Sequence, residues 1–185
     1  MAGRRLTVLA VLMLSASLVF AASSVVHFQR AEEAYEKGDY EKALKEYDAL
    51  VEILGEDAAV RHNRALVFMA LGEIGAAKAE AEQAVKLEPH EGKYLVTLGV
   101  ICLMGEKQEL KQAKKVLTRA AYVLLREKEW ISLATAYYNL GVIAVRENDM
   151  KEAERFFKKA VDLNPGDERF SAALDAVSHE DTQWF

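Results

Sequence analysis

One arrangement of residues recurs along this chain at intervals of 34 residues, as from Gly38 to Gly72. In the clearest copy, residues 134–167, apolar residues recur at helical spacing in two runs separated by a short polar turn. Asn148 in that turn suits the left-handed backbone conformation that ends a helix, and Asp149 can cap the helix that follows. Each copy therefore predicts two antiparallel helices. A pair this small cannot bury its own apolar side, so it needs further copies stacked alongside.

Four copies can be placed, over residues 24–57, 58–91, 92–127 and 134–167. The third has about two extra residues in its turn, and about six more residues precede the fourth. The pattern resembles the tetratricopeptide repeat. The residues of the fourth copy that carry this resemblance are Leu140, Gly141, Ala153, Phe157, Ala160 and Pro165.

The resemblance implies an all-α fold, a right-handed superhelical solenoid of antiparallel helix pairs spanning residues 24–178. After the fourth copy, Asp167 is placed to cap a last helix over residues 168–178, whose apolar residues fall on one side. Repeat stacks need such a helix to cover their last open side. Residues 179–185 then form a C-terminal tail. The resemblance also implies a non-catalytic adaptor whose partner is another protein.

The first 23 residues predict a targeting segment. Arg4 and Arg5 precede an uncharged, largely apolar run over residues 6–26. A positive start followed by such a run is typical of a secretory signal peptide, which is cleaved, or of a signal-anchor helix, which is retained. Both alternatives place the repeats on the extracytoplasmic side of a membrane, which in a bacterium is the periplasm. A retained segment would make the membrane a second partner.

Composition excludes some classes of function. The net charge of −5 argues against a nucleic-acid-binding protein, which would need a basic stripe. The single cysteine, Cys102, excludes an intramolecular disulfide, and its place in the third copy predicts a core residue. The four histidines lack metal-ligand spacing, and no nucleophile or phosphate-binding motif is present. The sequence therefore predicts no enzyme, no catalytic residue, no metal and no cofactor.

The resemblance implies that the first helices of successive copies line a concave groove. The residues that it places there are Phe28, Glu32, Tyr35, His62, Asn63, Leu66, Met69, Lys93, Val96, Val100, Leu103, Tyr138, Val142 and Arg146. The centre of this set is apolar and its charges lie mainly at the ends, as suits a groove for a peptide or helix of a partner. We expect Leu66, Val100 and Tyr138 to anchor that partner. The alternative is that some of these residues belong to the core.

Some family members hold a carboxylate in a clamp of basic and amide side chains. Asn63 and Lys93 match two positions of that clamp, but Glu32 occupies another and would repel a carboxylate. The sequence therefore excludes this function and leaves Asn63 and Lys93 as polar contacts for some other group.

Two further features allow alternatives. Basic residues gather on the second helix of the third copy, at Lys107, Lys111, Lys114, Lys115 and Arg119. They predict either a solvated outer side or a patch for an acidic partner. The tail ends on Trp184 and Phe185, which can enter the groove of a neighbouring copy or of the same chain. The chain would then be a self-assembling structural scaffold and a homo-oligomer.

Overall fold

The computed structural model describes residues 20–105 and 109–180, and within these residues the regular structure is entirely helical. A helix over residues 20–36 comes first. The helices that follow are α2 (Tyr40–Leu54), α3 (Ala58–Ala70), α4 (Ile74–Leu87), α5 (Gly92–Met104), α6 (Leu110–Glu127), α7 (Trp130–Arg146), α8 (Met150–Leu163) and α9 (Glu168–Glu180).

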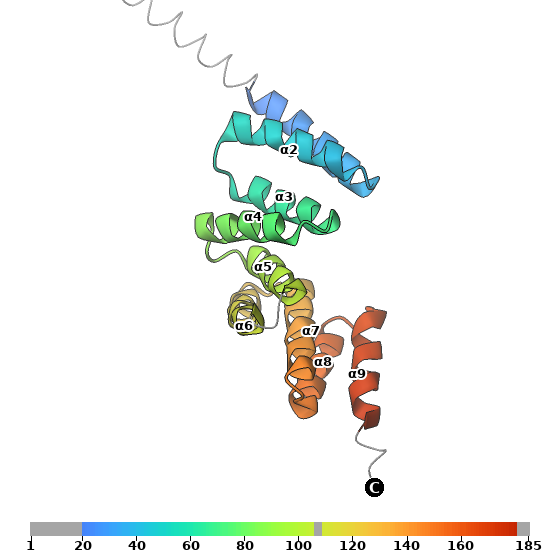
Figure 1. Cartoon of the computed structure of the whole chain (residues 1–185). Helices are drawn as coiled ribbons and strands as arrows, with labels where there is room; N and C mark the ends of the chain where they lie inside the picture. Colours follow the sequence, from blue (N-terminus) through green and yellow to red (C-terminus); the bar gives the residue numbers. More distant parts are fainter. Residues whose placement is uncertain (1–19, 106–108, 181–185) are drawn as a thin grey trace, which may run out of the picture.

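The helices form antiparallel pairs stacked in chain order, as Figure 1 shows. Residues 20–36 pair with α2, α3 with α4, α5 with α6, and α7 with α8, while α9 packs against α8. The predicted fold, an all-α stack of helix pairs closed by a capping helix, is confirmed. The first two residues of the predicted tail, 179 and 180, belong to α9, whereas the rest of the tail and most of the predicted targeting segment lie outside the described residues. Within the described residues, no helix combines the length and the apolar character needed to cross a membrane.

The turns inside the pairs follow from single residues. Gly38, Gly72 and Asn148 have φ angles of 75°, 78° and 62°, in the left-handed region that glycine adopts without strain and that asparagine tolerates. Asp149 then accepts a hydrogen bond from the backbone N–H of Glu152 at 3.0 Å, which caps α8. The predicted roles of Asn148 and Asp149 are confirmed.

The first helix begins earlier than the repeat pattern predicts. A start at residue 24 would make Ser24 a helix cap, whereas the chain is already helical at residue 20. The Ser24 hydroxyl instead donates to the backbone carbonyl of Ala21 at 2.9 Å. The physical reason is that no proline or glycine separates the preceding apolar residues from the first repeat, so nothing breaks the helix there.

Small residues at matching positions let the helices approach closely. Ala43, Ala77, Ala113 and Ala153 occupy the same position of the four copies, and all four are fully buried. A larger side chain there would push the two helices of a pair apart. Cys102 is also fully buried, as predicted, and burial raises the pKa of its thiol.

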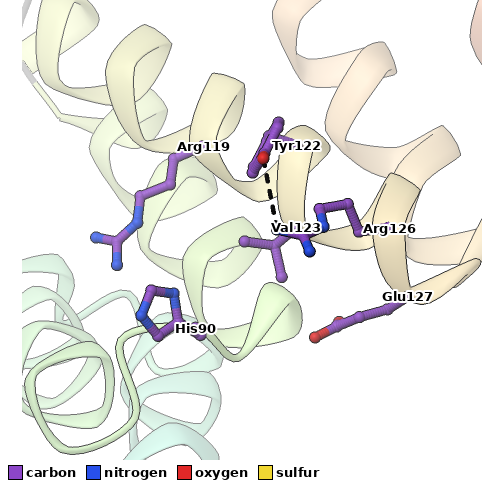
Figure 2. Close-up of a pocket in the computed structure, with 6 residues that line it drawn as sticks. All are labelled: His90, Arg119, Tyr122, Val123, Arg126 and Glu127. Atoms are coloured by element: carbon purple, nitrogen blue, oxygen red, sulfur yellow. Dashed lines mark hydrogen bonds between the residues drawn. The ribbon is translucent and has the colours of Figure 1, made fainter.

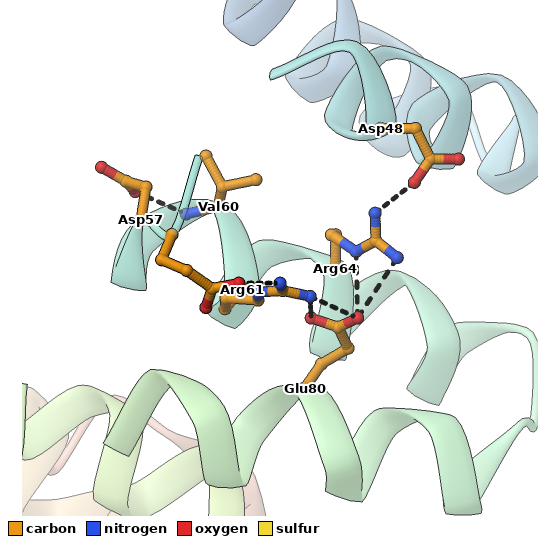
Figure 3. Close-up of polar contacts among 7 residues, drawn as sticks. Asp48, Asp57, Val60, Arg61, Arg64 and Glu80 are labelled. Carbon is orange, nitrogen blue, oxygen red and sulfur yellow. Dashed lines mark hydrogen bonds and ion pairs between the residues drawn. The ribbon is translucent and has the colours of Figure 1, made fainter. Parts of the chain in front are cut away.

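An ion-pair network joins the first two helix pairs (Figure 3). Glu80 on α4 accepts from Arg61 at 3.1 Å and from Arg64 at 3.2 Å, both on α3. Arg64 also pairs with Asp48 on α2. These side chains are largely shielded from water, apart from Asp48, so the pairing is weakly screened. Through Arg64 and Asp48 the network adds a polar contact between α2 and the second pair.

Candidate functional site

The first helices of successive pairs contact one another directly, α3 with α5 and α5 with α7. Together with residues 20–36 they form one side of the stack, which we call the groove side. Two hollows open on this side, one at each end. We call them the N-terminal pocket and the C-terminal pocket.

The N-terminal pocket encloses about 280 Å³. Residues 20–36, α2 and α3 line it with Glu32, Tyr35, Glu36, Tyr47, Asn63 and Leu66. Glu32 and Glu36 lie one turn apart on the same helix, and neither forms an ion pair with any described residue. The pocket therefore combines two carboxylates with aromatic walls, which suits a cationic or amphipathic group.

Tyr47 shows how the N-terminal pocket disfavours further negative charge. Burial, and next the nearby carboxylate of Glu32, raise the pKa of Tyr47 to about 12. The Asn63 side chain opposes this shift by hydrogen bonding. The Tyr47 hydroxyl is therefore uncharged at neutral pH and available as a donor.

The middle of the groove side is closed by contacts between α3 and α5. The His62 ring lies 3.0 Å from the Thr97 hydroxyl and packs on Tyr94 with the ring centroids 4.7 Å apart. Burial lowers the pKa of His62, so the ring is neutral at pH 7. Lys93 is exposed nearby, and its positive charge also lowers the pKa of His62.

Two of the predicted groove residues belong to the core instead. Val96 and Leu103 on α5 are only 9% and 6% exposed. Both lie in the hydrophobic clusters that α5 shares with α6 and α7. The reason is that α7 packs directly on α5 and covers the side that was expected to be open. Val100 and Met69 are partly buried against the same clusters.

The C-terminal pocket also encloses about 280 Å³ and is almost wholly apolar. Tyr138, Val142 and Val145 of α7, Met150 and Phe157 of α8, and Ala173, Ala176 and Val177 of α9 line it. The Tyr138 ring is fixed between Phe157 and Phe170, with centroid distances of 5.7 and 5.1 Å. The pocket is therefore an apolar hollow with aromatic packing on one side.

The structure brings the predicted residues together in two groups rather than one. Glu32, Tyr35, Asn63 and Leu66 share the N-terminal pocket, while Tyr138 and Val142 share the C-terminal pocket. Phe28 packs edge-to-face on Tyr47, with centroids 6.0 Å apart, and supports the N-terminal pocket from behind. Arg146 donates to the backbone carbonyl of Leu103 at 2.7 Å and so ties α7 to the end of α5.

The wall formed by α9 was not predicted as part of the groove. The apolar side of α9 is visible in the sequence, but the sequence predicts for it the single role of covering the end of the stack. Ala173 and Val177 do both, because they pack against the core cluster and also line the pocket, which Ala176 lines as well. No group of three or more metal-ligating side chains occurs within the described ranges.

Comparison with known families agrees with the repeat pattern. Two stretches of the chain, residues 58–91 and 134–167, match family models described as tetratricopeptide repeat. They are the second and fourth copies of the predicted repeat.

Solved structures show the same fold over most of the chain. PilF of Pseudomonas aeruginosa is similar, with a TM-score of 0.79 and 16% identity over 89% of this chain and 71% of that chain. A MamA fragment from Desulfovibrio magneticus has a TM-score of 0.70 and 19% identity over 86% of each chain. A tetratricopeptide repeat protein of Thermus thermophilus has a TM-score of 0.71 and 19% identity over 85% of this chain and 82% of that chain.

Residues 58–91 and 134–167 are therefore tetratricopeptide repeats, and the described residues share the fold of solved structures that include a tetratricopeptide repeat protein. Proteins of this class generally serve as scaffolds for protein–protein interactions and are typically non-catalytic. The partner is thus expected to be another protein, and its identity depends on the surface that this particular chain presents.

Proposed function

We propose that the protein is an adaptor on the extracytoplasmic side of a membrane, which binds a peptide or helix of a partner along its groove side. It would act in the assembly of an envelope complex. The observation that carries the binding proposal is the pair of hollows at opposite ends of the groove side. One is acidic and aromatic, the other apolar. A bound segment with a basic residue near one end and an apolar residue near the other would match both.

The proposed location rests on the first segment of the sequence. Two arginines followed by an uncharged run over residues 6–26 favour translocation of everything that follows. In a bacterium this places the groove in the periplasm, held at the inner membrane if the segment is retained and released if it is cleaved.

A fusion of alkaline phosphatase after Phe185 tests this location in a bacterial host. Phosphatase folds into its active form only where its disulfides can form, so an active fusion is expected. Replacing Arg4 and Arg5 with glutamate is expected to lower that activity, because the positive start sets the orientation. An inactive fusion made at normal levels would refute the proposed location.

Photocrosslinking in cells tests the groove. A photoreactive residue at Val142, which lines the C-terminal pocket, is expected to capture one protein that mass spectrometry can identify. The same residue at Lys158, which is exposed on α8, serves as the control and is expected not to capture that protein. Leu66→Glu, at the other pocket, is expected to abolish capture from Val142 while helicity is retained, since one segment spans both hollows. Equal capture from both positions would contradict a groove-bound partner.

Self-assembly is the second candidate, and the position of the C-terminal pocket favours it. Ala173, Ala176 and Val177 of α9 line the pocket, and the tail that ends on Trp184 and Phe185 follows directly after α9. Five residues beyond Glu180 can extend about 17 Å, enough to turn back along one helix face. Capture of the tail of the same protein from Val142 would support this candidate over the adaptor.

A further inference from the structure

Four large apolar side chains are exposed where α6 ends and α7 begins. Tyr122, Leu125, Trp130 and Ile131 are 63%, 50%, 45% and 72% exposed. They lie within ten residues of sequence, around the extra residues that precede the fourth copy. Single exposed apolar residues are common on proteins, but a cluster of this kind marks an interaction surface.

The same side of α6 is basic. Lys111, Lys115, Arg119 and Arg126 share one side of the helix with Tyr122 and Leu125, because positions three, four or seven apart face the same way. All four are exposed, and none forms an ion pair within the described residues. The remaining cation of α6, Lys114, differs, because it pairs with Glu147 at 2.6 Å. We call the four cations, with Tyr122, Leu125, Trp130 and Ile131, the basic-aromatic surface.

A cavity of about 500 Å³ lies beside this surface (Figure 2). His90, Arg119, Tyr122, Val123, Arg126 and Glu127 line it. Arg119 donates to the backbone carbonyl of Pro89 and extends toward His90, and Arg126 donates to the Tyr122 hydroxyl at 3.5 Å. Two guanidinium groups, with donors left over, and the single carboxylate of Glu127 border a hollow large enough for a phosphate-bearing headgroup.

We propose that the basic-aromatic surface docks on the anionic headgroups of a lipid bilayer. The cations are attracted to negatively charged lipids, and Tyr122 and Trp130 suit the boundary between headgroups and acyl chains. The side chains of Leu125 and Ile131 insert into the bilayer beside Tyr122 and Trp130. This goes beyond the proposed adaptor function and depends neither on the groove nor on the fate of the first segment.

The shape of the surface favours a bilayer over a peptide partner. It lies on the outer side of a helix, and Figure 1 shows α6 end-on at one edge of the molecule. A peptide or helix is usually held in a groove, whereas protruding aromatic and basic side chains match a flat, deformable lipid surface. Because α6 is the second helix of its pair, docking on this side leaves the groove side open.

The fluorescence of Trp130 tests the proposal. The chain contains two tryptophans, so full-length protein with Trp184→Phe reports on Trp130 alone. It is added to preformed vesicles of brominated phosphatidylcholine, with increasing fractions of phosphatidylglycerol. We expect quenching and a blue shift of Trp130 that need phosphatidylglycerol and weaken with salt. This readout is local, so a first segment that binds vesicles by itself does not obscure it.

Matched charge reversals provide the control. Lys111→Glu with Lys115→Glu is expected to raise the phosphatidylglycerol fraction for half-maximal quenching by at least about twofold. Lys151→Glu with Lys158→Glu, the same change on exposed positions of α8, is expected to leave it unaltered. Retained helicity checks the fold of each variant. Three results would overturn the proposal. They are equal quenching in neutral and anionic vesicles, no quenching in either kind of vesicle, and no effect of the charge reversal on α6. The proposal would also be overturned if the fluorescence of Trp130 changed with an acidic protein from the same cells but with no vesicle.

Discussion

Two glycines inside helices lie directly under large side chains of the neighbouring helix. A Cβ added at Gly141 on α7 would lie 2.5 Å from a ring carbon of Phe157 on α8. A Cβ at Gly99 on α5 would lie equally close to the Leu117 side chain on α6. The glycines thus occupy matching positions in the fourth and third pairs. At both positions the absence of a side chain, rather than backbone freedom, is what the fold requires.

Gly141→Ala is expected to destabilise the protein by about 1–3 kcal/mol, because the Phe157 ring cannot move without disturbing the buried cluster around it. Urea unfolding followed by circular dichroism measures the change. Gly75→Ala is the matched control, since it also replaces a helical glycine but meets nothing within 4 Å. We expect it to be neutral or to stabilise by up to about 1 kcal/mol through helix propensity. Destabilisation by both variants alike would show that steric contact is not the cause.

At the scale of single elements, α6 has two sides with different roles. Leu110, Ala113, Leu117, Ala120 and Leu124 face the core. Within this side Leu124 packs over Gly92, where a Cβ would lie 2.4 Å from a Leu124 side-chain carbon. The opposite side carries Tyr122 and Leu125 with four cations that form no ion pair within the described residues. Folding therefore accounts for the first side, and the proposed membrane contact concerns the second.

Two adjacent leucines of α6 separate these roles. Leu124→Ala is expected to cost about 2–5 kcal/mol of unfolding free energy, because Leu124 is fully buried and its removal leaves a cavity. Leu125→Ala is expected to change stability by less than about 0.5 kcal/mol, because Leu125 is half exposed. Thermal or urea unfolding of both variants checks this. A large loss from Leu125→Ala would mean that Leu125 supports the fold and is not free to contact a membrane.

At the scale of the whole molecule, charge is distributed unevenly along the stack. Residues 20–57 carry ten carboxylates and four basic side chains, which makes the first pair strongly acidic. The positive charge concentrates on α6 instead, where five cations meet one carboxylate. The modest net charge of −5 conceals this separation. The acidic N-terminal pocket and the basic outer side of α6 are therefore suited to partners of opposite charge.

The core is also divided along the stack. One hydrophobic cluster holds residues 20–36, α2 and part of α3, and further clusters hold the middle and the C-terminal pairs. Each pair contacts mainly its neighbours, as expected for a repeat protein. The Arg64–Asp48 ion pair is one of the contacts that join the first cluster to the rest.

The sequence by itself determined the helices, their pairing and their turns. Gly38, Asn148 and Asp149 act locally, through backbone conformation and caps that involve only near neighbours, so their effect can be predicted without knowledge of the fold. The alanines at matching positions belong to the same repeat pattern, and the structure buries all four of them between helices. Leu66 and Tyr138, which the resemblance implies face the groove, lie at hollows on the groove side, and their role as anchors stays a prediction.

Only the tertiary structure decided which groove positions stay open. Val96 and Leu103 share the helical register of Val100, yet α7 packs on α5 closely enough to bury both. The C-terminal pocket depends on how far α9 leaves Val142 and Met150 uncovered, which the sequence of α9 does not state. The basic-aromatic surface needs α6 and the start of α7 to meet at one corner. Burial depends on the angle between helices, and that angle is set by contacts between residues distant in sequence, beyond the reach of a local pattern.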